Sequence, residues 1–275
     1  MTDRQQFIRD CRSIRDCTPL ILNITNYVAM NFTAGALLAA GASPLMSLWP
    51  EEMEDLTARC DALVVNIGCV DAQQSDAMRT AVRAAKSFGK PWVLDPAGVG
   101  ASKARGRLCN ELIGLNAPAI IRGNASEICC LALGRQSGRG VDSTLESDEA
   151  LESAKEFASR TGTVISMSGK IDYITDGIRT ETVHNGHALM PRVTAMGCTS
   201  SALTGAFAAV DKDMVCSATN AAALMGRCGE IAAGVCRNSL EGKSPEDFIG
   251  TGSFATAFID ALSLFEAGSE AEKIK

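Results

Sequence analysis

The stretch VTAMGCTSSALTGAFAAV, residues 193–210, contains the features around which the rest of the chain is organised. Gly197 and Cys198 suit a sharp turn, and the residues that follow them are small or apolar. We therefore predict a loop that turns into a buried helix, with Cys198 at or near the first turn. Because the side chains of this helix are compact, the backbone of neighbouring elements can approach it closely.

The amino-terminal end of such a helix is suited to binding negative charge. Its first amides have no partner within the helix and together carry about half a positive charge. They attract a phosphate or a developing oxyanion, and they stabilise a thiolate at this position. The alternative is an ordinary helix start with an inert Cys198, because free cysteines are commonly buried as small apolar residues.

Length and composition favour one large α/β domain that spans residues 1–275. Of the 275 residues, 46% are hydrophobic and 21% are charged. Two small domains would also fit this length, and we favour one. A net charge of -6 argues against a nucleic-acid partner, which requires a basic face. No apolar run reaches membrane-spanning length, and residues 1–17 lack the apolar core of a signal peptide, so we expect a cytoplasmic protein with no membrane partner.

The eleven cysteines follow neither a disulfide pattern nor a metal-binding pattern. Their number is odd, they are scattered, and no CxxC pair occurs. The two histidines, His184 and His187, lie beside an expected turn and not on a helix. The spacing therefore argues against a zinc site, and we expect most cysteines to be reduced residues of the core.

Short apolar runs alternate with helical patterns along most of the chain, which predicts parallel strands joined by helices that cover both faces of one sheet. The expected strands are residues 19–23, 62–66, 92–94, 119–122 and 163–167, with another short element at 42–47. The expected helices are residues 27–40, 51–60, 71–88, 106–115, a segment after Asn124, 148–160, 215–236 and 254–265, and residues 134–149 are expected to form an exposed loop. Asp176–Gly177 is typical of a hairpin turn between 171–175 and 178–183, so we predict an antiparallel edge on a mostly parallel sheet.

Polar side chains lie at or just after the ends of the expected strands. They are Asn26, Asn66, Asp95, Arg122 and Asn124. Ligands of parallel sheets bind where the carboxyl ends of the strands open into loops. Each residue alone is equally typical of a turn or a helix cap. Their coincidence at one predicted edge favours a binding site there.

These residues supply the chemistry of phosphoryl transfer. Asp95 and Glu127 are carboxylates of the kind that Mg²⁺ binds together with waters and phosphate oxygens. Arg122 offers a planar fork that matches a phosphate group. The helix start at Cys198 would hold the transferred group while the cations neutralise its charge. The chain has no GxxxxGK[ST] sequence, which excludes the usual P-loop, and residues 98–100 (GVG) are weak evidence for a dinucleotide site.

From Pro19 to Leu264 the sequence resembles the hydroxyethylthiazole kinases, members of the ribokinase-like superfamily. The longest matching segments, IRGNASEI and GASPLM, are specific to that family. The matching segments are ITN (24–26), NFTA (31–34), GASPLM (41–46), NIG (66–68), LDPAGVGAS (94–102), IRGNASEI (121–128), NGHALM (185–190), MGC (196–198) and GTGSF (250–254).

The resemblance implies a single ribokinase-like α/β domain. It also implies ATP- and Mg²⁺-dependent phosphorylation of the primary alcohol of 4-methyl-5-(2-hydroxyethyl)thiazole, a salvage step in thiamine synthesis. A homotrimer with sites between subunits is expected for the same reason. The positions that match the family's site are, at the thiazole, Met46, Asn26 and Ala195; at the nucleotide, Arg122, Ser168 and Gly197; and at the magnesium ion, Asp95 and Glu127.

Cys198 occupies the position where related sugar kinases have an aspartate base. The resemblance implies that it deprotonates the substrate hydroxyl or positions it. An unperturbed thiol has a pKa of roughly 8.5, so Cys198 is a modest base unless its surroundings lower that value.

The chain departs from the family pattern at the start of this helix, where VTAMGC replaces VTGTGC. If the position of Ala195 needs a positive φ, alanine costs about 1 kcal/mol there. Met196 is expected to crowd the phosphate-facing loop, and Ala195 to reshape the substrate pocket. Gly35–Ala36 also replaces the usual Asn-Gly, and Ser168 stands where the family usually has Thr. Two alternatives therefore stay open: a kinase for another small heterocyclic alcohol, such as a hydroxymethylpyrimidine, and a non-catalytic protein that binds thiazole or nucleotide.

Overall fold

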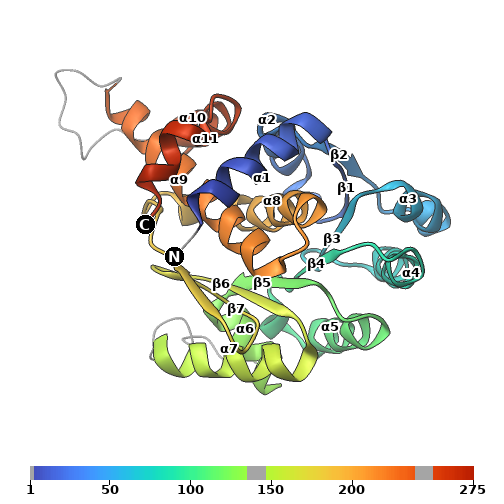
Figure 1. Cartoon of the computed structure of the whole chain (residues 1–275). Coiled ribbons are helices and arrows are strands. Elements are labelled where there is room, and N and C mark those ends of the chain that lie inside the picture. Colours follow the sequence, from blue (N-terminus) through green and yellow to red (C-terminus); the bar gives the residue numbers. More distant parts are fainter. Residues whose placement is uncertain (1–2, 135–146, 239–249) are drawn as a thin grey trace.

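The computed structural model describes residues 3–134, 147–238 and 250–275. In this part of the chain, eight strands form one sheet in the order β2-β1-β3-β4-β5-β6-β7-β8 (Figure 1). All pairs from β2 to β6 are parallel, and β7 and β8 complete an antiparallel edge. The predicted mixed α/β sheet is confirmed. The predicted loop at 134–149 lies almost wholly outside the described residues.

The strands agree with the expected ones to within a few residues. They are β1 (Leu20–Ile24), β2 (Ser43–Met46), β3 (Ala62–Asn66), β4 (Trp92–Asp95), β5 (Ile120–Asn124), β6 (Val164–Ser168), β7 (Asp172–Thr175) and β8 (Thr180–Val183). The helices are α1 (Arg4–Cys17), α2 (Met30–Ala40), α3 (Met53–Arg59), α4 (Ala72–Phe88), α5 (Lys103–Leu115), α6 (Ala125–Leu133), α7 (Ser147–Thr161), α8 (Met196–Val210), α9 (Met214–Asn238), α10 (Thr251–Ser263) and α11 (Ala267–Glu270).

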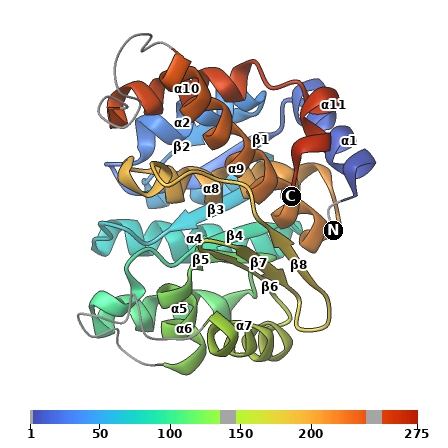
Figure 2. The ribbon, with the colours of Figure 1, turned by 90° about the vertical axis from the view of Figure 1, so that its left-hand side faces the viewer.

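Two helical layers enclose the sheet (Figures 1 and 2). Successive strand residues point to opposite faces, so Ile21 packs in one core and Leu22 in the other. Helices α1, α2, α8, α9 and α10 contribute to the core on the Ile21 side, and α3 to α7 contribute to the core on the Leu22 side. Because both faces are covered, the central strands are continuous apolar runs, as parallel sheets require.

Helix α1 was not predicted, and its sequence explains why. Residues 1–17 are mostly polar, but Phe7, Cys11 and Ile14 recur at helical spacing and are buried. Asp3 caps the helix by accepting hydrogen bonds from two first-turn amides. Helix α1 packs against α8 and α11, so the two termini lie side by side (Figures 1 and 2).

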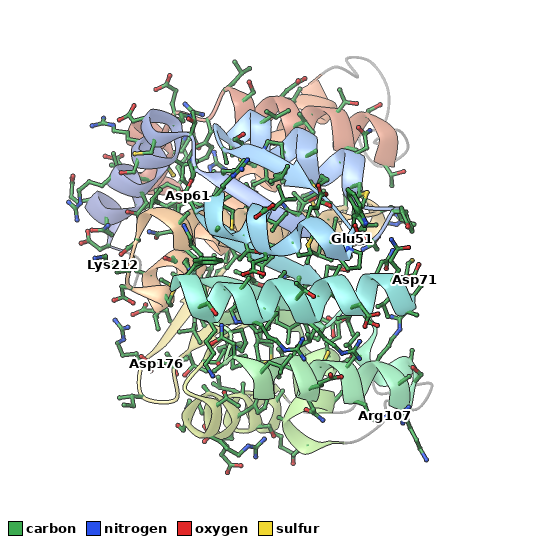
Figure 3. All side chains as sticks on the ribbon, turned by 90° about the vertical axis from the view of Figure 1, so that its right-hand side faces the viewer. Glu51, Asp61, Asp71, Arg107, Asp176 and Lys212 are labelled. Carbon is green, nitrogen blue, oxygen red and sulfur yellow. The ribbon has the colours of Figure 1, made fainter. Side chains whose placement is uncertain are left out.

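The two ends of the strands form two distinct ends of the molecule. Figure 3 shows Glu51 and Asp71 at one end and Asp61, Asp176 and Lys212 at the other. Asp71 precedes α4, which follows the carboxyl end of β3, whereas Asp61 precedes β3. Within the described ranges, no helix is both long enough and apolar enough to cross a bilayer.

A glycine lets α8 lie directly on the sheet. A Cβ atom added at Gly205 would lie 2.6 Å from Cγ2 of Val64 and 3.4 Å from Cγ2 of Ile21. Both neighbours are β-branched core residues on β3 and β1, with little freedom to move. The prediction that small residues allow close approach to this helix is confirmed. The contact at Gly205 fixes the position of the helix on the sheet.

Gly205→Ala should therefore lower the free energy of unfolding by about 1–3 kcal/mol, because the added methyl overfills the contact. Gly114→Ala is the matched control: it also lies in a helix, but an added Cβ meets nothing within 4 Å. This control should raise the free energy of unfolding by about 0.5–1 kcal/mol. Urea unfolding measures the free energy of unfolding of both variants, and its dependence on urea concentration should be unchanged. A Gly205→Ala protein as stable as the wild type would contradict the packing argument.

Candidate active site

The polar residues at the strand ends meet the start of α8 at the carboxyl edge of the sheet. Asn26 follows β1, Asn66 ends β3 and Asp95 ends β4, where Asn66 and Asp95 are register partners. Cys198 lies in the first turn of α8, as predicted. The structure thus brings residues from three strands and one helix to one place.

Two asparagines hold the thiol of Cys198. The Nδ2 groups of Asn26 and Asn66 donate to its Sγ, at 3.4 and 3.2 Å. The side chain of Asn26 also donates to Oδ1 of Asn66 at 3.0 Å. Backbone amides of Ala29 and Gly68 donate to the carbonyl oxygens of these two side chains, which fixes both amide groups. Asn66 was noted as a strand-end residue, but its contact with Cys198 was not foreseen.

The thiol of Cys198 is protonated at neutral pH. Burial raises its pKa to about 11, and the negative charge of Asp95 adds to this effect. The amide donors and Arg122 lower the pKa but do not outweigh burial. The sequence left the ionisation of Cys198 open, and in the structure burial is the largest effect on its pKa.

The first turn of α8 has two free amides. Its N-cap is Ala195, whose side chain cannot accept a hydrogen bond. The amide of Thr199 donates to the carbonyl of Ala195, whereas those of Gly197 and Cys198 have no acceptor among the described residues. Two donors at a positive helix end are a site for an anion.

Ala195 and Met196 behave differently from each other. Ala195 has φ 72° and ψ −3°, so this position is in the left-handed region that favours glycine, as suspected. Met196 is only 5% exposed and packs in the core on the α8 side of the sheet. The expectation that Met196 crowds the phosphate-facing loop is therefore wrong.

Asp95 is a buried carboxylate beside a second one. It accepts a hydrogen bond from Oγ of Ser201 at 2.7 Å. Burial raises the pKa of Asp95 to about 6, and the charge of Glu127 raises it further, against the opposing effect of Arg122. Ser201 was not predicted as a site residue, although it lies three positions after Cys198 and hence on the same side of α8.

Glu127 organises the loops around this carboxylate. Its Oε1 accepts from the amide of Gly98, and its Oε2 from the amide of Asn124, both at 2.9 Å. Asn124 in turn accepts from the amide of Glu127, which completes a capping box at the start of α6. Each carboxylate oxygen of Glu127 keeps a second lone pair for another partner.

This pair of carboxylates fits a magnesium ion. Asp95 and Glu127 are hard oxygen ligands, and both lie at the edge of the sheet where a ligand would enter. Their mutual repulsion is the second cause of the raised pKa of Asp95. A cation between them would turn this repulsion into attraction, so the residues present suit the ion.

Arg122 links β5 to the start of α8. Its Nη1 donates to the carbonyl of Gly197 at 3.2 Å, and a Cβ atom added at Gly197 would lie 3.1 Å from the same nitrogen. Glycine therefore leaves room for the guanidinium beside the free amides. Ser168 ends β6, where it is the register partner of Asn124, and its Oγ donates to the carbonyl of Gly123 at 3.4 Å.

Met46 lines a cavity of about 380 Å³ next to this centre. Tyr27 and Trp49 also line it, and both are more than half exposed. Cys198 is not among the lining residues, but Asn26, whose amide contacts Cys198, directly precedes Tyr27. The lining residues are Tyr27, Met30, Met46, Ser47, Leu48, Trp49, Asp71, Gln73 and Gln74.

Comparison with known proteins agrees with this architecture. The model of the hydroxyethylthiazole kinase family matches residues 11–267. The chain belongs to the hydroxyethylthiazole kinase family. Its sequence is 43% identical over 267 residues to a hydroxyethylthiazole kinase of Leptospira biflexa, covering 97% of this chain and 96% of that protein. The corresponding protein of Klebsiella pneumoniae is 44% identical over 249 residues, covering 90% of this chain and 91% of that protein.

Solved structures place this hydroxyethylthiazole kinase family member among the ribokinase-like folds. A hydroxyethylthiazole kinase from Pyrococcus horikoshii superposes with a TM-score of 0.83 and 36% identity, covering 98% of both chains. A pyridoxal kinase from Staphylococcus aureus superposes with a TM-score of 0.58 and 14% identity, covering 78% of this chain and 88% of that one. The second likeness concerns the fold alone.

The high pKa of Cys198 predicts a pH-dependent reaction with iodoacetamide. Because the folded-state pKa is raised, the thiolate fraction stays small at pH 7 and grows only as the pH approaches about 11. Between pH 7 and pH 9 we expect the alkylation rate of Cys198 to stay far below that of the exposed Cys17, measured by mass spectrometry of the intact fold. Rapid alkylation of Cys198 at pH 7 would show that the thiol is ionised.

Proposed function

We propose that the protein transfers the terminal phosphoryl group of ATP to the hydroxyl of 4-methyl-5-(2-hydroxyethyl)thiazole, in thiamine salvage. The observation that supports this most strongly is the uncapped first turn of α8. The two residues with free amides also contact the neighbouring site residues: the carbonyl of Gly197 accepts from Arg122, and Sγ of Cys198 accepts from Asn26. The acceptor substrate is inferred from membership of the family, and phosphoryl transfer is inferred from the residues of the site.

The phosphoryl group is held by donors and not by covalent chemistry. In its loose transition state the charge spreads over three oxygens, so positioned donors do most of the work. The amides of Gly197 and Cys198 bind these oxygens, and Arg122 adds a positive charge beside them. Asp95 and Glu127 would hold Mg²⁺, which would supply positive charge to neutralise the phosphate groups.

Cys198 positions the acceptor hydroxyl instead of deprotonating it. Its thiol is neutral, and Asn26 and Asn66 hold the sulfur with two donated hydrogen bonds. The thiol can then still donate its S–H proton. It donates a hydrogen bond to the hydroxyl oxygen of the thiazole alcohol and so orients this oxygen toward the phosphoryl group. A loose transition state needs little proton removal before the new O–P bond forms, so a strong base is not required; the hydroxyl proton is lost, finally to solvent, as this bond completes and ADP leaves.

The two substrates approach from neighbouring strands. Met46, Asn26 and Ala195 form the thiazole side, where the cavity lined by Met46 accepts an apolar ring. Arg122 and Ser168, on β5 and β6, form the nucleotide side together with Gly197. The order of these strands supports an arrangement with the acceptor and the donor on opposite sides of the first turn of α8.

A kinase assay with ATP, Mg²⁺ and the thiazole alcohol tests this proposal through release of ADP. We expect turnover with the thiazole alcohol and at least tenfold less with a hydroxymethylpyrimidine. Cys198→Ala should lower kcat about 10²-fold, as loss of one positioned group does. Preference for the pyrimidine would favour the other acceptor class, and ligand binding without turnover would favour the non-catalytic alternative.

Asp95→Asn should raise the Mg²⁺ concentration needed for half-maximal activity at least tenfold, because a carboxylate ligand is lost. Asp76→Asn, on the exposed face of α4, is the control and should leave the Mg²⁺ requirement unchanged. An unaltered Mg²⁺ dependence of the Asp95→Asn protein would count against a metal role for this residue.

We further propose a cytoplasmic homotrimer in which a neighbouring copy covers the thiazole cavity. Tyr27, Val28 and Trp49 are 64%, 63% and 52% exposed. Tyr27 and Trp49 line the cavity together with Met46, and Val28 directly follows Tyr27 in the chain. Large apolar side chains exposed together are typical of a surface that another chain covers. Free cysteines fit a reducing compartment.

Val28→Asp should break the assembly, because it places a charge in the covered surface, and light scattering should report a mass of one chain instead of three. Ile178, on the turn between β7 and β8, is 94% exposed and gives the matched control. Ile178→Asp should leave the mass unchanged. A wild-type protein that elutes as a monomer would contradict the proposed trimer.

A further inference from the structure

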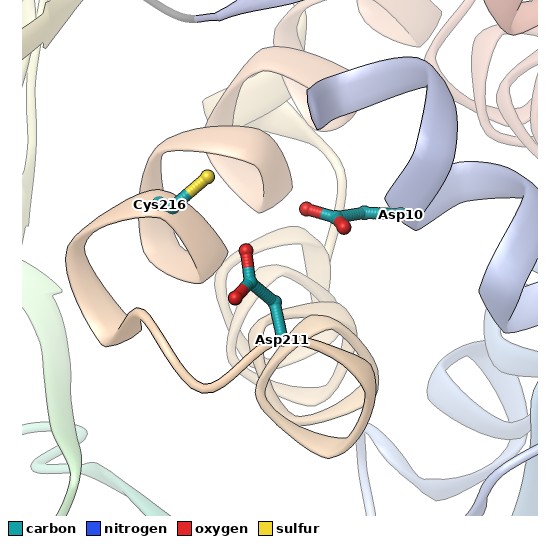
Figure 4. A group of neighbouring side chains, drawn as sticks. All are labelled: Asp10, Asp211 and Cys216. Carbon is teal, nitrogen blue, oxygen red and sulfur yellow. The ribbon is translucent and has the colours of Figure 1, made fainter. Parts of the chain in front are cut away.

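A second group of metal-ligating side chains lies at the other end of the molecule. Asp10 of α1, Asp211 directly after α8 and Cys216 in the first turn of α9 converge there (Figure 4). One ligand atom of each residue lies within 4.8 Å of those of the other two. Helix α8 has 15 residues, so about 22 Å separate this group from the site at its first turn.

This cluster holds two carboxylates without a balancing cation. Asp10 is only 3% exposed, and neither it nor Asp211 forms an ion pair within the described parts of the chain. The nearby Arg179 is already bound to Asp176 and Asp213.

Side-chain amides hold the ligands in place. Gln6 donates to Asp10 at 2.7 Å and to Asp211 at 3.4 Å. Asn220 donates to the other oxygen of Asp10 at 2.7 Å and to Sγ of Cys216 at 3.4 Å. The amide of Asp213 donates to Oδ1 of Asp211 at 2.9 Å. The carboxylates keep lone pairs that these donors do not use.

One buried atom in this cluster lacks a partner. Asn220 is fully buried with its amide end facing Asp10 and Cys216, and its Oδ1 has no hydrogen-bond partner. A buried carbonyl oxygen left in this way is costly. Water on a bound metal ion would donate to it, or the amide could rotate and offer its oxygen to the ion directly. Asn220 also lines a cavity of about 320 Å³ that adjoins the cluster and leaves room for such a water.

We propose that Asp10, Asp211 and Cys216 bind a divalent cation of the zinc type. A thiolate with two carboxylates suits a borderline ion, whereas Mg²⁺ and Ca²⁺ prefer oxygen ligands alone. On binding, a metal–sulfur bond forms and the S–H proton leaves to solvent. The sequence argued against zinc because no CxxC or paired histidine occurs, and the structure brings the ligands together from α1, the residue after α8 and the start of α9.

A cation at this position would tie α1 to the turn between α8 and α9. Because α8 also carries the site at its other end, the cation would stabilise the helix without touching substrate. Protein from which this cation has been removed should therefore keep its kinase activity when it is assayed with Mg²⁺. It should unfold at a lower temperature than the protein with the cation bound. At a Zn²⁺ concentration of one hundred times Kd, the unfolding midpoint should rise by about 5 °C.

Cobalt provides a direct test, because thiolate-bound Co²⁺ absorbs strongly in the near ultraviolet. Full-length protein freed of metal by a chelator, with excess Mg²⁺ present, is titrated with CoCl₂. We expect the absorption to saturate at one equivalent and to disappear when one equivalent of Zn²⁺ is added. The Cys216→Ser protein should lack the absorption, whereas Cys17→Ser, which removes an exposed cysteine of α1, should retain it.

Asp211→Asn gives a second variant at a partly exposed position, so a folding defect in Cys216→Ser does not decide the outcome. It should weaken Co²⁺ binding at least tenfold while leaving the midpoint of the metal-free protein unchanged or higher, since one buried repulsion is removed. Absorption that persists in Cys216→Ser, or a wild-type protein that neither absorbs nor gains stability, would overturn the proposal.

Discussion

The close contact between α8 and the sheet at Gly205 determines where everything else in the site lies. With no side chain between them, the helix rests on β1 and β3 and its first turn reaches the carboxyl ends of those strands. Asn26 and Asn66 then contact Cys198, and Arg122 contacts Gly197. Free amides, a guanidinium and carboxylates meet at one edge because a single helix is placed against parallel strands.

The same burial that assembles the site decides its protonation. Desolvation outweighs the hydrogen bonds from Asn26 and Asn66 and the charge of Arg122, and it raises the pKa of Cys198 to about 11, so in the proposed reaction this thiol acts as a donor. Desolvation also raises the pKa of Asp95, and the charge of Glu127 acts in the same direction. The site is therefore short of positive charge until a cation arrives, which suits a centre that binds Mg²⁺ with ATP.

Periodicity predicted the strands, the antiparallel edge and the helix at Cys198, because burial on both faces leaves continuous apolar runs. Strand ends also indicated Asn26, Asn66, Asp95 and Arg122, which the structure brings together. The hydrophobic periodicity could not predict that the side chain of Met196 is buried in the core. It also could not predict the hydrogen bond that Ser201 donates to Asp95. Such contacts depend on how α8 is rotated against the sheet. The ligand cluster stayed hidden because Asp10, in α1, is far in the sequence from Asp211 and Cys216.

A crystal structure with ADP, Mg²⁺, aluminium fluoride and the thiazole alcohol tests the central claim most directly. The account predicts the fluoride at the first turn of α8, about 2.7–3.1 Å from the amide nitrogens of Gly197 and Cys198. The acceptor oxygen should lie within hydrogen-bond distance of Sγ of Cys198, on the side away from ADP. Fluoride bound elsewhere, with these two amides contacting only water, would contradict it.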